Sequence, residues 1–109
     1  MWSVSPATRI FVARGATDMR MGFNGLYARV KLALERDPMS GHLFVFCNRR
    51  RTRLKILYWD GSGLWVCAKR LERGRFTWPE KGELTSGELG MLVGGLELNR
   101  AREKKWHRV

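Results

Sequence analysis

The stretch that decides the fold reads HLFVFCNRRRTRLKILYWDGSGLWVCAKR and occupies residues 42–70. It contains three runs of strand length, at residues 42–47, 53–59 and 64–70, rich in the β-branched and aromatic residues that strands favour. The turn DGSG at residues 60–63 is a strong hairpin signal, and residues 48–52 (NRRRT) form the other turn. The stretch therefore predicts a meander of three antiparallel strands.

The elements outside this stretch are predicted from helical spacing and capping signals. Residues 9–13 (RIFVA) indicate a short strand. The apolar positions that follow are spaced as one face of a helix, with Thr17-Asp18 as the expected N-cap and Pro38 beyond its end. These positions are Met19, Phe23, Leu26, Val30 and Leu34.

The last third of the chain predicts a further short strand and a second helix. Residues 75–78 precede Pro79 and have strand composition. Thr85 and Glu88 have the spacing of a capping box, so a helix should run from there to Val93 and stop at the following glycine pair. The predicted order is β-α-β-β-β-(β)-α, which is an α+β fold with an antiparallel sheet of four to five strands and two helices.

The size and composition of the chain indicate one compact domain. Its 109 residues suit a single domain, and 44% hydrophobic residues suffice for a core, which excludes wholesale disorder. The longest unbroken apolar run has five residues, against about 18 for a membrane span. No signal peptide is visible. We expect a domain over residues 1–98, a basic tail over residues 99–109, a cytoplasmic location and no membrane association.

Side-chain alternation divides the meander into two faces, if Trp59 pairs with Leu64 and Asn48 with Arg53. We expect the first helix to pack on a mostly aliphatic face, which carries Leu43, Val45, Cys47, Leu54, Ile56, Tyr58, Trp65 and Cys67. The opposite face mixes rings with cations and carries His42, Phe44, Phe46, Arg53, Lys55, Trp59 and Arg70.

The mixed face has two interpretations. Aromatic rings beside cations can stack unpaired bases and hold phosphates, as on single-strand-binding sheets. Alternatively, Phe44, Phe46 and Trp59 lie in an ordinary core under the second helix or at an interface with a dimer partner. The alternation of residues does not distinguish the two.

The cysteines and histidines do not predict a metal site. The chain has two of each, and none has zinc-ligand spacing, so we expect no metal and no cofactor. Cys47 and Cys67 fall on predicted strands that are separated by a third, which places them about 9–10 Å apart and excludes a disulfide. Both are expected to be inert core thiols in a reducing compartment.

The charge of the chain indicates an anionic partner. Lys and Arg number 21 against 10 acidic residues, which gives a net charge of +11, and nucleic acid is the commonest partner of such a domain. Nine of these cations lie between residues 49 and 75, where only Asp60 and Glu72 oppose them. They are the candidate nucleic-acid-binding residues: Arg49, Arg50, Arg51, Arg53, Lys55, Lys69, Arg70, Arg73 and Arg75. Arginine is suited to this role because its planar fork binds phosphate or guanine edges. The alternative is a solvated cationic surface.

Catalysis is not indicated by any motif. The acidic residues are scattered, whereas a metal-dependent nuclease needs two or three clustered carboxylates. No phosphate-binding loop, dinucleotide fingerprint or nucleophile elbow occurs. We therefore expect no catalytic residues and no enzyme. A metal-free ribonuclease, by analogy with small basic toxin nucleases, is a third interpretation.

Long segments of the chain resemble one family. The sequences SPATRIFVARGATDMRMGFNGL at residues 5–26, FVFCNRRRTRLKILYWDGSG and KRLERGRFTWP within residues 37–79, and ELTSGELGMLVGGLEL at residues 83–98 cover most of the chain. They resemble the small accessory protein encoded by bacterial insertion sequences of the IS66 type. The sequence departs from that pattern at Met21, where Lys is more usual, and at Cys47, Cys67 and Ala68. These departures affect packing rather than the arginines.

The resemblance implies a role in transposition beside a separate, larger transposase that carries the catalytic carboxylates. It implies no defined biochemical activity. Together with the charge, it predicts a non-catalytic accessory protein that binds double-stranded DNA, at the element ends or the target. The alternative is a protein–protein adaptor that docks its cationic face on the transposase without touching DNA. The sequence leaves the oligomeric state open.

Overall fold

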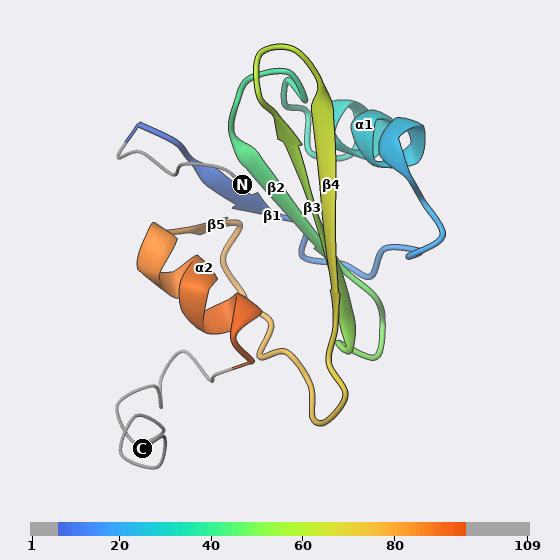
Figure 1. Cartoon of the computed structure of the whole chain (residues 1–109), viewed down its shortest axis with the longest axis vertical. Coiled ribbons are helices and arrows are strands. Elements are labelled where there is room, and N and C mark those ends of the chain that lie inside the picture. The colour runs from blue at the N-terminus through green and yellow to red at the C-terminus, as the bar shows by residue number, and fades with distance from the viewer. Residues whose placement is uncertain (1–6, 96–109) are drawn as a thin grey trace.

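A five-stranded sheet with helices packed on both faces forms the structure, a computed structural model that describes residues 7–95 (Figure 1). The spatial order of the strands is β4-β3-β2-β1-β5. In chain order the elements are β1 (Ile10–Val12), α1 (Phe23–Leu32), β2 (Leu43–Cys47), β3 (Arg53–Trp59), β4 (Leu64–Arg70), β5 (Glu83–Leu84) and α2 (Ser86–Val93). The predicted α+β class is confirmed. Residues 96–98 and the predicted basic tail, residues 99–109, lie outside the described residues.

The central meander has the predicted register. Trp59 pairs with Leu64 across the β3–β4 hairpin, and the Asn48 N–H donates to the Arg53 carbonyl at 3.0 Å beyond the end of β2. The bounds of β3 and β4 are those predicted, and β2 begins one residue later than expected. Alternation and turn chemistry therefore sufficed to place these three strands.

The sheet is mostly antiparallel but contains one parallel pair. Ile10 in β1 lies beside Leu43 in β2, and the two strands run in the same direction. Such a pair requires a crossover connection, which α1 supplies. The other pairs, including the short one between β1 and β5, are antiparallel.

The prediction of a strand at residues 75–78 is wrong, and the fifth strand of the sheet is β5. The Phe76 N–H donates to the Arg51 carbonyl at 2.7 Å, and the Trp78 indole Nε1 donates to the Ala13 carbonyl at 3.0 Å. The segment thus crosses the end of the sheet and inserts the buried Phe76 ring into the core. Alternating aromatic residues in a core-filling loop gave the same pattern as a strand.

The predicted start of the first helix is also wrong. α1 begins at Phe23 after Gly22, which provides no side-chain cap. Thr17 is buried, and its N–H donates to the Cys47 carbonyl at 2.8 Å, so the chain there still follows the end of β2. Asp18 accepts from the Arg20 N–H at 2.9 Å instead of capping a helix.

The second helix agrees with the prediction. Thr85 Oγ1 accepts from the Glu88 N–H at 3.1 Å, and the Glu88 carboxylate accepts from the Thr85 N–H at 2.9 Å. This reciprocal pair is the capping box expected from the sequence. The helix ends at Val93, before the glycine pair.

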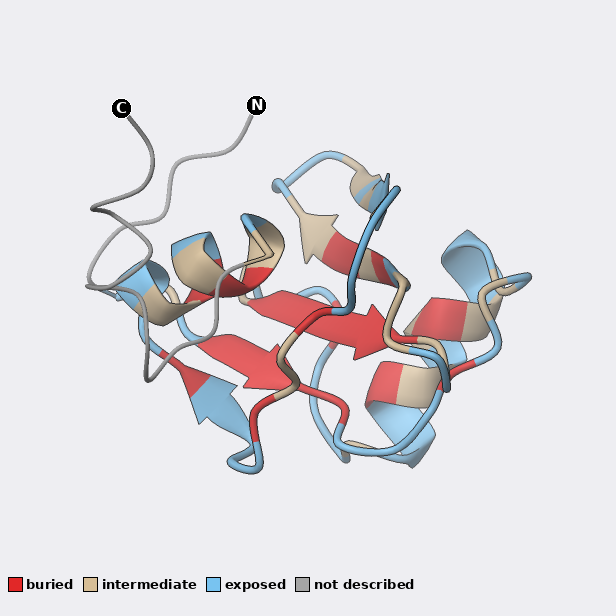
Figure 2. Cartoon of the chain, turned by 90° about the horizontal axis from the view of Figure 1, so that it is seen from below, coloured by how far each residue is buried: buried red, intermediate tan, exposed pale blue. Residues whose placement is uncertain are grey.

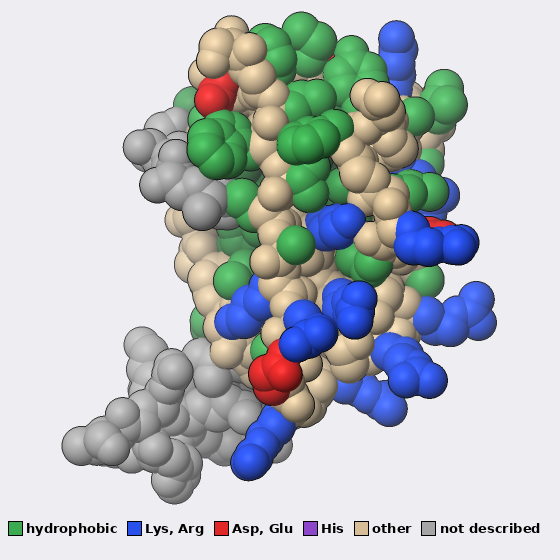
Figure 3. All heavy atoms as spheres, turned by 45° about the vertical axis from the view of Figure 1, so that its right-hand side comes forward, with side chains coloured by type: hydrophobic (Ala, Val, Ile, Leu, Met, Phe, Trp, Pro, Cys, Tyr) green, Lys and Arg blue, Asp and Glu red, His purple; other side chains and the backbone are tan. Residues whose placement is uncertain are grey.

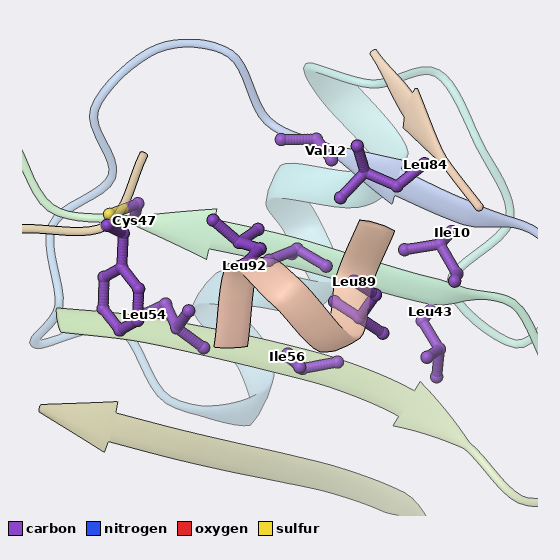
Figure 4. Close-up of a cluster of buried hydrophobic side chains, with 11 residues drawn as sticks. Ile10, Val12, Leu43, Cys47, Leu54, Ile56, Leu84, Leu89 and Leu92 are labelled. Carbon is purple, nitrogen blue, oxygen red and sulfur yellow. The ribbon is translucent and has the colours of Figure 1, made fainter. Parts of the chain in front are cut away.

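The two faces of the sheet carry the predicted side chains, but the helices that cover them are exchanged. The aliphatic face packs with α2 through Leu89 and Leu92, not with the first helix (Figure 4). The opposite face packs with α1 through Leu26 and Val30. The face that a crossover helix covers depends on the handedness of its connection, which alternation within strands does not report.

The base-stacking platform proposed for the mixed face is wrong. Phe44 and Phe46 are fully buried in the cluster beneath α1, and the neighbouring Trp59 is half-buried. Figure 2 shows the buried central strands between the helices. The core interpretation is therefore confirmed for the two phenylalanines, with α1 rather than α2 as the covering helix. Cys47 and Cys67 lie on β2 and β4 with β3 between them, as predicted.

Candidate nucleic-acid interface

The nine predicted cations come from segments that meet at one end of the sheet. Arg49, Arg50 and Arg51 occupy the turn between β2 and β3. Arg53 opens β3 and lies directly opposite Arg70, which closes β4. Arg73 and Arg75 follow in the segment after β4. Lys and Arg side chains gather over the lower half of this face in Figure 3, while hydrophobic side chains gather over the upper half.

Asn48 organises the arginine-rich turn. Its Oδ1 accepts from the Thr52 N–H at 2.9 Å and from the Arg53 N–H at 3.0 Å, while its Nδ2 donates to Thr52 Oγ1 at 3.1 Å. A short Asx side chain that replaces a backbone partner is typical of tight turns. The bonds hold the turn closed and leave Arg49 and Arg50 exposed at its tip.

Arg51 points back into the protein. It is half-buried with a left-handed φ of 60°, and its guanidinium lies 5.2 Å from the centre of the Trp78 ring. Its Nη2 donates to the Arg14 carbonyl at 3.4 Å. Arg51 thus joins the turn to the segment after β1, and this intramolecular role competes with a role in binding.

The two lysines of the predicted set also make internal bonds. Lys55 Nζ donates to the Met19 and Met21 carbonyls, both at 2.8 Å, and so ties the irregular segment before α1 to the sheet. Lys69 Nζ donates to the Val93 carbonyl at 2.7 Å, at the C-terminal end of α2. A cation there also complements the helix dipole.

The remaining six predicted residues form what we call the arginine cluster. Their side chains are exposed, and they are Arg49, Arg50, Arg53, Arg70, Arg73 and Arg75. Within residues 7–95, one ion pair involves this set, between Arg70 Nε and Glu72 Oε2 at 2.9 Å, and both of its side chains are largely exposed. Such exposed pairs contribute little. The cluster therefore carries a concentrated positive charge that the described residues barely neutralise.

An open hollow of about 560 Å³ lies beside this cluster, and Arg53 and Arg70 both line it. Like charges directly opposite each other on neighbouring strands destabilise a sheet. A phosphate between the two guanidinium groups would convert that repulsion into attraction, which is the main chemical capability of this end of the sheet.

A second cationic hollow, of about 420 Å³, was not predicted. It lies where β1 ends and α1 finishes, and Arg14, Arg29 and Arg36 line it. The Arg36 guanidinium lies 4.0 Å from the centre of the Phe11 ring. Arg29 and Arg36 lie near the end of α1, and only the crossover through α1 brings them beside Arg14, so no local signal indicated the group.

Two acidic groups, Asp18 and Asp60, are engaged within the chain. Hydrogen bonds from Arg20 lower the pKa of Asp18 to about 2. Asp60 accepts from the Ser62 and Gly63 N–H groups and from the Trp65 indole, and these bonds lower its pKa too. Among residues 7–95, no group of three or more His, Cys, Asp or Glu is placed to hold a metal ion.

Two further observations bear on the class of protein. Burial raises the pKa of the Cys47 thiol, which keeps it protonated at neutral pH and unsuited to nucleophilic attack. In the part of the chain that the structure describes, neither helix has the length and apolar character that a membrane span needs.

Comparisons with known proteins identify relatives over nearly the whole chain. A family model described as "IS66 Orf2 like protein" matches residues 8–103. Two proteins of Sinorhizobium fredii (strain NBRC 101917 / NGR234) are similar, and both carry the name "Uncharacterized protein". The first, y4hO, is 40% identical over 99 residues, which cover 87% of this chain and 86% of the relative. The second, y4jC, is 41% identical over 104 residues, which cover 92% and 89%. No solved structure matches the chain.

Proposed function

This chain belongs to the IS66 Orf2-like protein family, and we propose that it assists a separate transposase as a non-catalytic protein that binds double-stranded DNA through the arginine cluster. Membership of the family supports an accessory role in transposition. The main support for a DNA contact is the position of Arg53 and Arg70, which lie opposite each other at one end of the sheet and line an open hollow. The ligand would be an element end or the target duplex.

Electrostatic attraction favours the proposed contact between the arginine cluster and DNA. DNA presents closely spaced phosphates with condensed counterions, and each cation that replaces a counterion gains free energy from its release. Arginine binds phosphate through two parallel hydrogen bonds. In this proposal all six arginines of the cluster contact phosphates, and Arg49 and Arg50 at the tip of the turn do so beside a groove.

Arg51, Lys55 and Lys69 have a supporting role in this proposal. Each donates to a backbone carbonyl elsewhere in the chain. A side chain that is held in this way positions the exposed arginines but has few donors left for DNA. Replacing any of the three should therefore lower the free energy of unfolding but remove few phosphate contacts.

A gel-shift series tests the proposal. The purified protein is titrated against terminal inverted repeats, scrambled duplex and single strand at several salt concentrations. Six phosphate contacts predict a slope of about −5 in log K against log salt, and a loss of affinity of about 10³-fold between 50 and 200 mM salt. Absence of binding at low salt, or affinity that does not change with salt, contradicts the proposal.

The adaptor hypothesis makes a different prediction. A protein that docks its cationic face on the transposase should co-purify with it from nuclease-treated lysate and should not bind DNA alone. Loss of the complex on nuclease treatment would indicate that DNA joins the two proteins, as the DNA-binding proposal expects. Equal loss of inverted-repeat and scrambled binding in a cluster variant would indicate phosphate contacts rather than base reading.

A further inference from the structure

The strand β4 lies at one edge of the sheet, next to β3 alone (Figure 1). Hydrogen bonds at both ends of the hairpin show which backbone groups point away from β3. The Asp60 N–H donates to the Gly63 carbonyl, and the Leu71 N–H donates to the Thr52 carbonyl. Because bonding alternates along an antiparallel pair, the even-numbered residues of β4 direct their N–H and C=O groups outward. These residues are Leu64, Val66, Ala68 and Arg70.

The two halves of this edge differ in chemistry. The half near the hairpin carries Leu64, Val66 and the Trp65 ring, which is 44% exposed, and Asp60 adds a negative charge beyond it. The other half carries Lys69 and Arg70. Figure 3 shows hydrophobic side chains over the upper part of this face and cations over the lower part. An edge of this kind is complementary to itself when reversed, because its apolar, acidic end then meets its cationic end.

We propose that β4 pairs antiparallel with β4 of a second copy of this chain, about a two-fold axis at Cys67, so that the two sheets become one. In this register Leu64 bonds with the partner's Arg70 and Val66 bonds with the partner's Ala68. Cys67 lies directly opposite the partner's Cys67. The pairing does not involve DNA, so it goes beyond the proposed function and stands independently of it.

The charges and the backbone groups favour this register over a shift toward the cationic end of the strand. All four outward-pointing residues find partners, since each even residue lies opposite another even residue. Trp65 lies opposite the partner's Lys69, and Asp60 lies toward the partner's cationic end. A shift that centres the axis on residue 69 would place two lysines directly opposite each other and leave the apolar half unpaired, which is unfavourable. Charged residues on an edge often prevent pairing, but here the register keeps like charges apart.

Cross-linking tests the register directly, with single-cysteine chains oxidised by diamide. A Cys47→Ala chain keeps Cys67, whose Cα would lie about 4.5 Å from the partner's equivalent Cα, as in a non-hydrogen-bonded pair. That separation permits a disulfide. The matched control is Cys47→Ala with Cys67→Ala and Ala68→Cys. Its thiols would be offset by two residues, about 7 Å along the strand in addition to the spacing between strands, which is too far.

We expect the chain with Cys67 to form a disulfide-linked dimer at least tenfold faster than the control chain. Equal rates would mean random collision and would overturn the proposal. A second variant, Ala68→Pro, removes an outward N–H that β3 does not use, and proline is tolerated on edge strands. This variant should melt at a similar temperature but sediment as a monomer at concentrations where the wild type forms dimers.

A dimer that persists in Ala68→Pro would overturn the proposal, and so would a wild type that remains a monomer at every concentration. Salt separates this failure from failure of the DNA-binding proposal. Salt screens the repulsion between two cationic copies, so dimerisation should hold or strengthen as salt rises. DNA binding should weaken steeply over the same range. If the chain stays a monomer and its β4 edge pairs only with the transposase, the edge binds another protein and the dimer proposal fails.

Discussion

Asn48 determines how the arginine-rich turn is presented. Its side chain makes three hydrogen bonds to Thr52 and Arg53 within the turn. Those bonds hold Arg51 in a left-handed conformation that non-glycine residues seldom adopt. The residue that shapes the candidate interface is thus uncharged and half-buried.

Replacement of this residue should therefore destabilise the fold. We expect Asn48→Ala to lower the free energy of unfolding by about 1–3 kcal/mol, because two N–H groups lose their acceptor. Urea unfolding measures the change. The control is Asn24→Ala, the same substitution at an exposed position of α1, which should change stability by less than about 0.5 kcal/mol. Equal effects at both sites would contradict the assigned role of Asn48.

Asp18 and Arg20 provide a test by titration. Hydrogen bonds from Arg20 hold the pKa of Asp18 at about 2, below its ordinary 3.8. A lowered pKa in the folded state stabilises the fold above the unfolded pKa, and the contribution is lost as pH falls from 3.8 toward 2. In Arg20→Ala the backbone N–H of residue 20 still donates to Asp18, so the pKa of Asp18 measured by NMR should rise from about 2 but stay below 3.8. A midpoint that stays near 2 would exclude Arg20 as the cause.

At the scale of elements, α2 depends on its cap. The helix has eight residues, too few to be stable alone, so its capping box and its buried face must hold it. Thr85→Ala should cost about 1 kcal/mol, because the Glu88 N–H loses its acceptor. Ser86→Ala at the next, exposed position should be neutral or slightly stabilising. Thermal unfolding followed by circular dichroism would detect the difference. An unchanged unfolding temperature in Thr85→Ala would contradict the stabilising role of the capping box.

Elements with strong local signals could be predicted from the sequence. Strands β3 and β4 have the predicted bounds because a two-residue alternation and a DGSG turn both specify them. The start of α1 could not be predicted. Thr17 is a residue type typical of N-caps, but its N–H donates to the Cys47 carbonyl at the end of β2. Phe76 resembles a strand residue but fills the core from a loop. In each failure, long-range packing decided between local alternatives.

The candidate site was predictable in part for the same reason. A run of arginines in a turn between two strands is visible in sequence, and the register places Arg53 opposite Arg70. That Lys55 and Arg51 bond to distant carbonyls depends on segments more than 30 residues away. The hollow lined by Arg14, Arg29 and Arg36 requires the crossover through α1.

At the scale of the whole molecule, the charge is unevenly distributed along the sheet. The arginine cluster occupies one end of the strands, and the hairpin with Asp60 and exposed apolar side chains occupies the other. In the proposed dimer the two clusters would lie at opposite ends of the joined strands. Two clusters related by a two-fold axis suit the two-fold symmetry of a DNA duplex.

The proposed DNA binding depends on the arginine cluster rather than on the net charge of the chain. The most direct measurement compares two variants that each lower the net charge from +11 to +7. One carries alanine at Arg49, Arg50, Arg53 and Arg70. The other carries alanine at four exposed cations elsewhere, namely Arg9, Lys31, Arg36 and Lys81.

Both variants are titrated against duplex DNA by fluorescence anisotropy over a series of salt concentrations. The cluster variant should lose about three to four units of the slope of log K against log salt, since four phosphate contacts contribute about 0.9 each. The control variant should lose less than about one. Equal losses in the two variants would show that binding follows the net charge alone and would contradict the assignment of the arginine cluster.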